Sequence, residues 1–411
     1  MYKIGEFIYP WGSGHYSRMV RFHDAFSELM KDDFESHFSS KDHVYKKLLE
    51  KFPDQIDKIH NILMPTPIDG KFGPSILLSM LNFLLPVRQN PPLLNQIVDY
   101  LREERKLYNQ EKFDLVINDG DMGSNILAKN RNIPSLFITN QFRPKLYKSK
   151  MYFYPSLYFI AKQIAKASKI IVADSPPPYT LCEFNLNFTN EAKSKVSYVG
   201  HFMNKKIIHN RPLSDFEKII QDNDFGYWMR TGNHSTNEGT GERYEQVFHL
   251  DEMKNEKRII SHAKSDPSIN SVLGRNGKKF TISEALEKKI DWIQIDIGYL
   301  SEQEKEEVLN LSKYAVVNGS HTVMGEILGG KSKPIIGIPI YDEHTNNIKW
   351  AEQKNLAVLA KKPQHVIKGI KSIKENYDKF EGNLLDFSKN FVSNGAENTA
   401  KIATEILEEK R

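Results

Sequence analysis

The sequence predicts an α/β protein made of two doubly wound domains that face each other across a crevice. Three observations support this prediction: the chain has 411 residues, short apolar runs alternate with segments of helical spacing, and the alternation breaks near Pro212 before it starts again. A chain of this length is long enough for two or three domains that each bury a core. Strands that alternate with helices are typical of βαβ units and parallel sheets.

The first alternation lies in residues 1–203, which we expect to form the N-terminal domain. Its strand candidates are YKIGEFIY (2–9), FDLVINDG (113–120), PSLFITNQ (134–141), KIIVADS (169–175) and KVSYVGHF (195–202). Ligands of doubly wound sheets bind beyond the carboxyl ends of the strands, so the loops after these strands are the places to look for chemistry.

The second alternation lies in residues 204–386, which we expect to form the C-terminal domain. Ser301 followed by Glu304 is a capping-box pattern that predicts a helix start at this point. A last helix is expected over 387–411, packing back across both domains. The strand candidates are FGYWMR (225–230), KRIISHA (257–263), DWIQIDIG (291–298), YAVVNGS (314–320) and KPIIGIPI (333–340).

Composition indicates a reducing compartment and an anionic partner. Cys182 is the single cysteine of the sequence, which excludes an internal disulfide and a cysteine-based zinc site and suits the cytoplasm. The start, MYKIGEFIYP, lacks the basic region and long apolar core of a signal peptide. The net charge is +5 and the pI about 8.8, so nucleotide sugars, phospholipid surfaces and nucleic acid are all candidate partners.

Two segments suit a membrane surface. The longest apolar stretch, FGPSILLSMLNFLLP (72–86), is shorter than the roughly 20 residues of a spanning helix, so it fits either a segment that lies on a membrane or a buried packing helix. Residues 140–169 mix aromatic rings with cations, which suits a membrane interface and equally an ordinary helix with a solvated basic face. No nucleic-acid motif is present, so nucleic acid is not expected. The cations are Arg143, Lys145, Lys148, Lys150, Lys162 and Lys166.

The turn NGSHT (318–322) follows a predicted strand and starts a predicted helix. Its backbone amides and hydroxyls are able to hold a diphosphate at the positive end of the helix dipole. Glu326 lies one helical turn further along the same face, where a carboxylate accepts hydrogen bonds from ribose hydroxyls. The alternative is that the turn only caps the helix and that Glu326 is solvated.

A second polar loop, YDEHTNN (341–347), follows the next predicted strand, on the same edge of the sheet. Asp342, Glu343, Asn346 and Asn347 are side chains that bind the hydroxyls of a hexose. The two loops together favour a nucleotide-sugar site over a simple helix cap.

The block VVNGSHTVMGEILGGKSKPIIGIPIYDEHTNN (316–347) resembles the C-terminal half of the GT-B glycosyltransferases, whose two domains are Rossmann-like. It is similar to the family 28 branch, with the bacterial N-acetylglucosaminyltransferase of peptidoglycan synthesis and the plant galactolipid synthases. The resemblance implies that the turn contacts the diphosphate, that Glu326 contacts the ribose and that the second loop contacts the sugar. The family usually has Gln where this chain has His344. The implied donor-binding residues besides Glu326 are Gly319, Ser320, His321, Thr322, Glu343, His344 and Asn347.

The same family carries a short Ser/Thr/Gly loop beside the pyrophosphate, after the first strand of this domain. Thr231 and Gly232, in WMRTGNHSTNEGTGERY (228–244), match that loop, and the resemblance implies that they contact the donor. The segment from there to Gly241 is longer and more polar than the family's loop. We expect it to form a lid or a plain surface loop.

The N-terminal loop of these enzymes is rich in glycine and carries a histidine, and Gly12-Ser13-Gly14-His15 is similar to it, with Arg18 further on. The resemblance implies that this loop faces the acceptor and that His15 is the general base for the acceptor hydroxyl. Imidazole suits the task because its pKa lies near neutral pH. The alternative is a histidine at a helix start that only satisfies a backbone carbonyl.

A histidine base is often supported by a carboxylate, and NDGDMGSN (118–125) offers Asp119 and Asp121 at another predicted strand end. The sequence does not decide between them. Their spacing also matches the metal-binding aspartates of the other large glycosyltransferase fold. In a GT-B arrangement helix amides and basic residues stabilise the leaving diphosphate, so no metal and no other cofactor is expected.

The sequence therefore predicts a GT-B glycosyltransferase that moves a sugar from a nucleotide diphosphate donor, such as UDP-GlcNAc, to a lipid-linked or other hydroxyl or phosphate acceptor, with inversion. We expect it in the cytoplasm, peripheral at the inner face of the membrane. Two alternatives are a nucleotide-sugar 2-epimerase and a non-catalytic sugar-nucleotide-binding subunit. The sequence leaves open the sugar, the base, the acceptor, the pathway and the oligomeric state.

Overall fold

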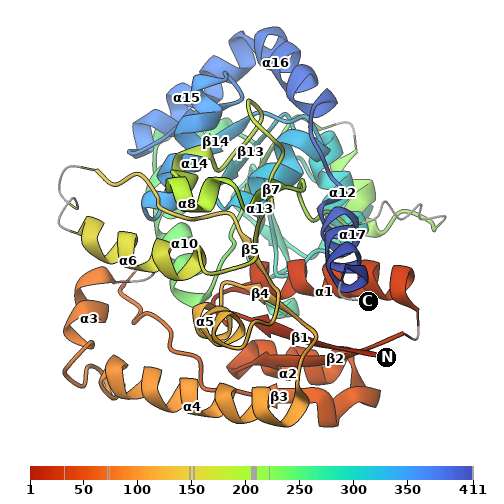
Figure 1. Ribbon diagram of the computed structural model, residues 1–411. Coiled ribbons are helices and arrows are strands. Elements are labelled where there is room, and N and C mark those ends of the chain that lie inside the picture. The colour runs from red at the N-terminus through yellow and green to blue at the C-terminus, as the bar shows by residue number, and fades with distance from the viewer. Residues whose placement is uncertain are drawn as a thin grey trace. The chain divides into compact units, whose positions relative to one another are not determined.

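The computed structural model describes residues 1–31, 33–71, 73, 75–147, 150, 153–204, 211–221 and 223–409. The chain forms two compact units, each with a central sheet and helices packed on it (Figure 1). The first unit comprises 1–70, 74–204 and 392–411, and the second comprises 71–73 and 205–391.

The first unit contains a seven-stranded sheet in the order β3-β2-β1-β4-β5-β6-β7. All neighbouring strands are parallel. The chain order reverses beside β1, which lies between β2 and β4, so the switch point of this sheet is at the carboxyl ends of β1 and β4. The strands are β1 (Tyr2–Ile8), β2 (Phe34–Ser40), β3 (Ile59–Asn61), β4 (Leu115–Asp119), β5 (Ser135–Thr139), β6 (Lys169–Val172) and β7 (Val196–Tyr198).

Helices cover both faces of this sheet because its strands alternate buried side chains between two cores. Ile4 of β1 packs in one core with α1 and α17, whereas Phe7 packs in the other with α4. The helices are α1 (Ser13–Met30), α2 (Asp42–Lys51), α3 (Ile76–Leu81), α4 (Leu93–Glu111), α5 (Met122–Asn130), α6 (Tyr154–Ile164), α7 (Glu183–Leu186), α8 (Asn190–Lys193), α17 (Gly395–Glu408) and the 3₁₀ helix Pro53–Lys58.

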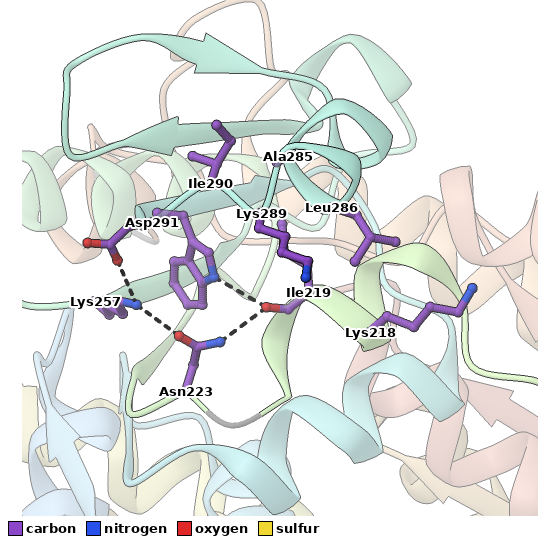
Figure 2. A pocket seen from close by; sticks show the side chains of 10 residues that line it. Lys218, Ile219, Asn223, Lys257, Ala285, Leu286, Lys289, Ile290 and Asp291 are labelled. Atoms are coloured by element: carbon purple, nitrogen blue, oxygen red, sulfur yellow. Dashed lines mark hydrogen bonds and ion pairs between the residues drawn. The ribbon is translucent and has the colours of Figure 1, made fainter.

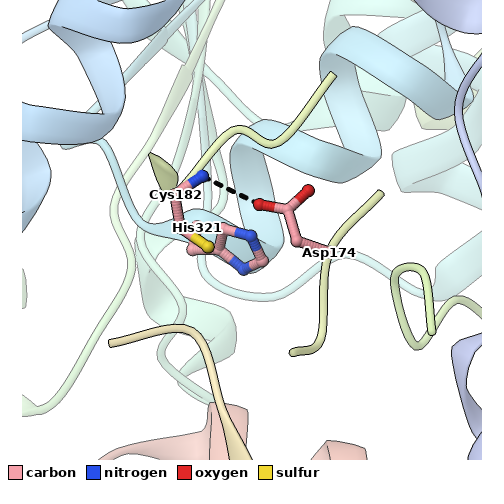
Figure 3. A group of neighbouring side chains, drawn as sticks. All are labelled: Asp174, Cys182 and His321. Atoms are coloured by element: carbon pink, nitrogen blue, oxygen red, sulfur yellow. Dashed lines mark hydrogen bonds between the residues drawn. The ribbon is translucent and has the colours of Figure 1, made fainter. Parts of the chain in front are cut away.

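The loop after β6 is fastened by Asp174. Its carboxylate accepts hydrogen bonds from the Ser175 N–H at 2.7 Å and from the Cys182 N–H at 2.8 Å, the second of which is drawn in Figure 3. The single cysteine is buried in this unit.

The second unit contains an eight-stranded sheet in the order β11-β10-β12-β9-β8-β13-β14-β15. It is parallel except at β10, which is antiparallel to both β11 and β12. Its switch point lies at the carboxyl ends of β8 and β13. The strands are β8 (Gly226–Met229), β9 (Arg258–Ser261), β10 (Ser271–Gly274), β11 (Lys279–Phe280), β12 (Trp292–Ile297), β13 (Tyr314–Val317), β14 (Ile335–Gly337) and β15 (Ala357–Leu359).

The predicted capping box is present, since Ser301 accepts from the Glu304 N–H and Glu304 accepts from the Ser301 N–H at the start of α12. The helices of this unit are α9 (Asp215–Ile220), α10 (His234–Phe248), α11 (Ile282–Glu287), α12 (Glu302–Leu311), α13 (His321–Gly325), α14 (Asp342–Gln353), α15 (Pro363–Glu375), α16 (Tyr377–Lys389), the 3₁₀ helices Asp251–Asn255 and Pro267–Ile269, and the π-helix Glu326–Gly330.

The expected loop up to Gly241 is wrong, because α10 begins at His234. Asn233 caps this helix by accepting a hydrogen bond from the Thr236 N–H at 3.0 Å, and the Thr240 hydroxyl donates to the Thr236 carbonyl at 2.7 Å. Its polar residues Thr236, Asn237 and Thr240 are buried, so polarity here marks an interior helix and not a surface loop.

Two other expected elements also differ. Asp342 to Asn347 form the first turns of α14 and not a loop. The last predicted helix is interrupted, since α16 ends at Lys389 and α17 begins at Gly395. Between them Val392 donates its N–H to the Ser175 hydroxyl and accepts from the His201 N–H, which holds the chain out of a helix.

Within the described residues of the apolar stretch 72–86, the one helix is α3, which has six residues. Among the described residues, no helix is both long enough and apolar enough to span a bilayer. Lys148, one of the cations noted in the sequence, lies outside the described residues.

Candidate active site

His15 and Asp119 meet at the switch point of the first sheet. His15 lies in the first turn of α1, directly after β1, and Asp119 is the last residue of β4. The parallel register pairs Ile8 with Asp119, which places the two strand ends side by side. His15 Nδ1 lies 2.6 Å from Asp119 Oδ1. The strand order therefore joins two sequence segments that are 104 residues apart.

Arg18 completes this cluster from the next turn of α1. Its Nε donates to Asp119 Oδ2 at 2.8 Å, and its Nη2 donates to Asp119 Oδ1 at 2.7 Å. Asp119 is fully buried, and burial on its own would raise the pKa of the carboxyl. The charges of Arg18 and His15 outweigh this and leave the pKa of Asp119 below its ordinary value. The carboxylate is thus ionised at neutral pH.

The imidazole of His15 is oriented but accessible. Its side chain is 23% exposed, while that of Asp119 is not exposed at all. With Nδ1 donating to Asp119, Nε2 is the atom that takes up a proton, and it has no hydrogen-bond partner in the part of the chain that the structure describes. The edge of Tyr9 contacts the ring, with the ring centroids 5.7 Å apart. Oriented imidazole with an ionised carboxylate behind it is the arrangement of a general base.

Two glycines permit this arrangement. Gly12 occupies the position before α1 with φ +78°, and Ser13 and Gly14 are the first residues of the helix. Gly120 follows Asp119 with φ +84°, and a Cβ there would lie 2.9 Å from Tyr9 and 3.0 Å from His15.

Asp121 has a different environment from Asp119. It caps α5 by accepting from the Gly123 N–H at 3.0 Å, and it contacts the Tyr100 hydroxyl. Burial raises the pKa of Asp121, and burial together with Asp121 raises the pKa of Glu104 well above its ordinary value. The structure therefore brings Asp119 to His15, whereas Asp121 belongs to a buried cluster with Tyr100 and Glu104.

In the second unit, Asn318 joins the two loops at the switch point. Its Oδ1 accepts from the Ser320 N–H at 3.1 Å and from the Thr231 hydroxyl at 3.4 Å. Its Nδ2 donates to the Thr231 carbonyl at 3.1 Å and to the Thr240 hydroxyl at 3.3 Å. The sequence placed this residue in the turn but not among the site residues, although its position directly after a strand is the signal that identifies it.

The predicted diphosphate residues lie on these two loops. Gly232, with φ +101°, and Gly319, with φ +96°, take conformations that favour glycine. Ser320 and Thr322 are half-buried, and His321 is buried at the start of α13. This unit therefore presents backbone and hydroxyl groups where the first unit presents charged side chains.

Glu326 is the first residue of a π-helix that continues α13. Its carboxylate lies 2.6 Å from the ammonium of Lys305 on α12, and both side chains are 23% exposed. π-Helical turns inside helices are frequent at functional sites. Lys305 is a partner of Glu326 that sequence reasoning did not identify.

The predicted sugar-binding residues occupy the first turns of α14. Asn347 is buried and donates to the Gly319 carbonyl at 3.0 Å, so it fixes the turn. His344 is buried against Tyr341, with ring centroids 3.8 Å apart, and burial lowers the pKa of His344 to about 3. The imidazole is thus neutral, and its Nδ1 has no hydrogen-bond partner among the described residues. Glu343 is half-buried.

A second polar cluster follows β8 and β9. Arg230, which directly precedes Thr231, donates to Asn237 Oδ1 at 3.1 Å and lies 3.1 Å from Glu238 Oε1. Its guanidinium also contacts His262, whose Nε2 lies 2.8 Å from Asp296 Oδ1. Sequence reasoning missed this cluster, although Arg230 and His262 lie at or near the carboxyl ends of two predicted strands.

The pocket drawn in Figure 2 lies at the opposite edge of the second sheet. Lys257 precedes β9 and Trp292 begins β12, so both lie at the amino ends of strands. Lys257 donates to Asn223 Oδ1 at 2.8 Å and pairs with Asp291 at 3.0 Å, and the Trp292 indole donates to the Ile219 carbonyl at 3.3 Å. Lys257 thus joins Asn223 and Asp291, and this edge of the sheet is not the one where doubly wound sheets bind ligands.

Comparison with solved structures identifies the architecture. Over 98% of this chain and 99% of the other, it is similar to the glycotransferase of kitacinnamycin, with a TM-score of 0.63 and 12% identity. It is also similar to MurG of Acinetobacter baumannii, with a TM-score of 0.57 and 10% identity over 98% of this chain and 100% of that one. The chain has the GT-B fold. The predicted fold class is confirmed, with two Rossmann-like units in one chain, while identities this low do not place it in one GT-B branch.

The GT-B fold also serves a different reaction. A UDP-N-acetylglucosamine 2-epimerase is similar over 100% of this chain and 96% of its own, with a TM-score of 0.56 and 12% identity.

Two sequence relatives from archaea carry a functional name. An uncharacterized glycosyltransferase of Methanosarcina acetivorans is 27% identical over 282 residues, which are 66% of this chain and 63% of that protein. One of Methanosarcina mazei is 27% identical over 236 residues, 55% of this chain and 58% of that protein. The alignments thus span less than two thirds of either relative. No family model matches the chain.

Proposed function

We propose that this protein is a glycosyltransferase that moves a hexose from a nucleotide diphosphate donor to a hydroxyl or phosphate acceptor. The observation that carries the proposal is the pair of His15 and Asp119 at the switch point of the first sheet, with Nδ1 and Oδ1 2.6 Å apart. The GT-B fold and the names of the two archaeal relatives support it.

In the proposed reaction, His15 Nε2 removes the proton of the acceptor hydroxyl. The acceptor oxygen attacks the anomeric carbon of the sugar, the bond from that carbon to the diphosphate oxygen breaks, and the diphosphate leaves with the electron pair. This single displacement inverts the anomeric centre. Asp119 fixes the tautomer of His15 and stabilises the imidazolium that forms. Arg18 keeps Asp119 ionised.

The proposed donor site is the switch point of the second sheet. Backbone and hydroxyl groups of its two loops would bind the diphosphate, and Glu326 would bind the ribose. His344 would accept a hydrogen bond from a sugar hydroxyl at Nδ1, which would satisfy a buried polar atom, and Glu343 would bind a second hydroxyl. We assign Asn347 a positioning role, because it holds the Gly319 carbonyl. The loop residues are Thr231, Gly232, Gly319, Ser320, His321 and Thr322.

We further propose that the donor is a uridine diphosphate sugar and that no metal takes part in transfer. A UDP-sugar is the substrate named for the similar epimerase. Diphosphate charge would be stabilised by helix amides and basic side chains. Omitting Mg²⁺ and Mn²⁺ from the assay is expected to leave the transfer rate unchanged, and a rate that depends on either ion would contradict this assignment.

The proposed acceptor is lipid-linked, and the segment 77–85 is the surface that would rest on the membrane. Six large apolar side chains in this segment are between 46% and 67% exposed, which is unusual for a soluble surface. Arg88 follows, and the net charge of the chain is +5, which suits an anionic lipid surface. The six are Leu77, Met80, Leu81, Phe83, Leu84 and Leu85.

Co-sedimentation tests this surface. The wild-type protein is expected to sediment with vesicles of phosphatidylcholine and phosphatidylglycerol. The Leu84→Glu, Leu85→Glu double variant is expected to stay in the supernatant. Leu385→Glu, at a 50% exposed leucine of the second unit, is the matched control and is expected to bind like the wild type. Equal binding by all three proteins would rule out the segment.

The function as a whole is tested by donor binding followed by transfer. Thermal unfolding is measured with UDP, GDP and dTDP sugars, and the sugars of one nucleotide alone are expected to stabilise the protein. At a ligand concentration of about 100 times the dissociation constant, the stabilisation should be about 2.7 kcal/mol. The stabilising nucleotide sugar, labelled in its sugar, is then incubated with the protein and with diacylglycerol and polyprenyl phosphate in mixed vesicles. Labelled lipid would support the proposal, and stabilisation by none of the donors would contradict it.

The epimerase reaction remains a second candidate because of the similar epimerase structure. It is distinguished by incubation with donor alone. An isomeric nucleotide sugar formed without acceptor would favour the epimerase, whereas unchanged donor favours transfer.

A further inference from the structure

A cluster of metal-ligand side chains lies at the edge of the first sheet that is opposite to His15. Glu35 and His37 project from the same face of β2, because alternate residues of a strand share a face. They pair in register with Lys3 and Gly5 in the first half of β1. Glu111, the last residue of α4, reaches the same point. Two carboxylates and an imidazole from two elements thus converge away from the proposed reaction.

The distances within this cluster fit a single cation. His37 Nε2 lies 2.7 Å from Glu35 Oε1 and 3.4 Å from Glu111 Oε2. The three candidate ligand atoms all lie within 4.8 Å of one another. Bonds of about 2.0–2.2 Å put the ligand atoms of a tetrahedral zinc ion about 3.4 Å apart. Only a small opening of the contact between His37 and Glu35 would therefore be needed.

His60 of β3 fixes the orientation of His37. The two imidazoles stack with their planes 5° apart, and His37 Nδ1 lies 3.2 Å from His60 Nε2. At this distance His60 Nε2 is placed to accept the Nδ1–H of His37. The lone pair of His37 Nε2 then faces the two carboxylates. Metal-bound histidines usually donate their other ring N–H in this way.

Three lone-pair atoms at this spacing repel one another unless a proton or a cation lies among them. Two lysines already pair with these carboxylates: Lys3 Nζ lies 3.0 Å from Glu111 Oε2 and 3.9 Å from Glu35 Oε1, and Lys58 Nζ lies 3.2 Å from Glu35 Oε2. Both ammonium groups would therefore compete with a metal ion. Both lysines are about one third exposed and have flexible stems, so they are able to turn to solvent when the carboxylates take another partner.

We propose that Glu35, His37 and Glu111 form a zinc site, with water as the fourth ligand. Zinc takes imidazole and carboxylate ligands in this number when one position is open to solvent. The ion would fasten β2 to the end of α4 and would not take part in transfer. A proton on His37 is the alternative occupant of the same position.

Isothermal titration of the purified, chelator-treated protein with ZnCl₂ tests the site. One ion per chain is expected, together with a higher melting temperature and, with CoCl₂, the visible absorption of tetrahedral cobalt. Glu111→Gln is expected to weaken zinc binding at least tenfold. Glu405→Gln, at an exposed carboxylate of α17 in the same unit, is the matched control and should bind like the wild type.

Lys58→Met provides the opposite test, because it removes a cation that competes for Glu35 and leaves all three ligand residues unchanged. It is expected to tighten zinc binding. Saturable binding that is lost in Glu111→Gln and strengthened in Lys58→Met supports the site. Absence of saturable binding in the wild type, or equal affinity in the wild type and Glu111→Gln, would overturn it and leave the proton as the occupant.

Discussion

At the switch point of the first sheet a buried carboxylate, Asp119, is held by a guanidinium and an imidazole, whereas at the switch point of the second sheet a buried amide, Asn318, is held by hydroxyl and backbone groups. Both lie at or just after the end of the strand that crosses the reversal in chain order. A charged cluster is suited to moving a proton, and a neutral cluster with N–H and O–H groups is suited to holding an anion. The same topological position thus supports two different chemical tasks.

The largest expected effect comes from removing the imidazole of the first switch point. His15→Ala is expected to lower the transfer rate by about 10²–10⁴-fold, the usual contribution of a general base. The affinity for the UDP sugar, measured by titration calorimetry, should stay within about twofold, because His15 is proposed to act on the acceptor. A tenfold change would correspond to about 1.4 kcal/mol. The exposed His249, changed to Ala, is the control. Unchanged turnover in His15→Ala would remove His15 from the mechanism.

Asp119→Asn separates the two aspartates of the first unit. Breaking a buried ion pair leaves Arg18 without its charge partner and is expected to lower the free energy of unfolding by about 3 kcal/mol at pH 7. Because folding lowers the pKa of Asp119, its contribution is present above the unfolded pKa of about 3.9 and is lost as pH falls through the folded pKa. Denaturant unfolding should therefore show a difference from wild type that is constant near neutral pH and shrinks below about pH 4.

Asp121→Asn is the matched comparison for that experiment. Folding raises the pKa of Asp121, so its ionised form costs stability as pH rises through the folded pKa. Asn keeps an oxygen that caps α5. This variant is expected to be at least as stable as the wild type at pH 8 and to keep its transfer activity. Equal destabilisation by the two substitutions would mean that the aspartates are not distinct.

Asn318→Asp places a charge in the neutral switch point. A carboxylate beside the proposed diphosphate site is expected to weaken UDP-sugar binding about tenfold or more, through repulsion between like charges. Asn310→Asp, at an exposed position of α12, adds the same charge elsewhere in the unit and should leave the affinity unchanged. Titration calorimetry at two salt concentrations measures both. Equal affinities would place the diphosphate elsewhere.

Glu326→Ala tests the proposed ribose contact at the second switch point. Loss of hydrogen bonds from a carboxylate to ribose should weaken UDP binding by about 1.5–3 kcal/mol, which is roughly 10- to 150-fold. It should weaken uracil binding little, because uracil lacks the ribose. The exposed Glu287 changed to Ala is the control. UDP affinity equal to that of the wild type would show that Glu326 does not contact the nucleotide.

Apolar strands could be predicted from the sequence, and polar buried elements could not. All ten strand candidates contain a strand, and in every one except β7 the strand carries buried apolar side chains. β2, with the sequence FESHFSS, was missed because Ser36, His37 and Ser39 are buried polar residues. α10 was missed for the same reason. Burial of polar groups depends on hydrogen-bond partners elsewhere in the chain, which a local pattern does not contain.

The candidate site was predictable residue by residue but not as a geometry. His15 was identified from its loop, and Asp119 and Asp121 were equally plausible beside it. The choice depends on strand order, since β1 pairs with β4 and the last residue of β4 is Asp119. One residue after Gly120, the chain turns into α5 and Asp121 becomes its cap. Non-local pairing of strands therefore decided what spacing could not.

The position of α17 in the sequence affects when the first unit is completed during translation. Ala396, Ala400, Ala403 and Leu407 share one core with β1 and α1, yet the whole second unit separates them in sequence from the rest of that core. During translation, the first unit emerges early but does not obtain these side chains until nearly 190 further residues have been made. The second unit is contiguous apart from 71–73, so all of its residues are made before the first unit receives α17.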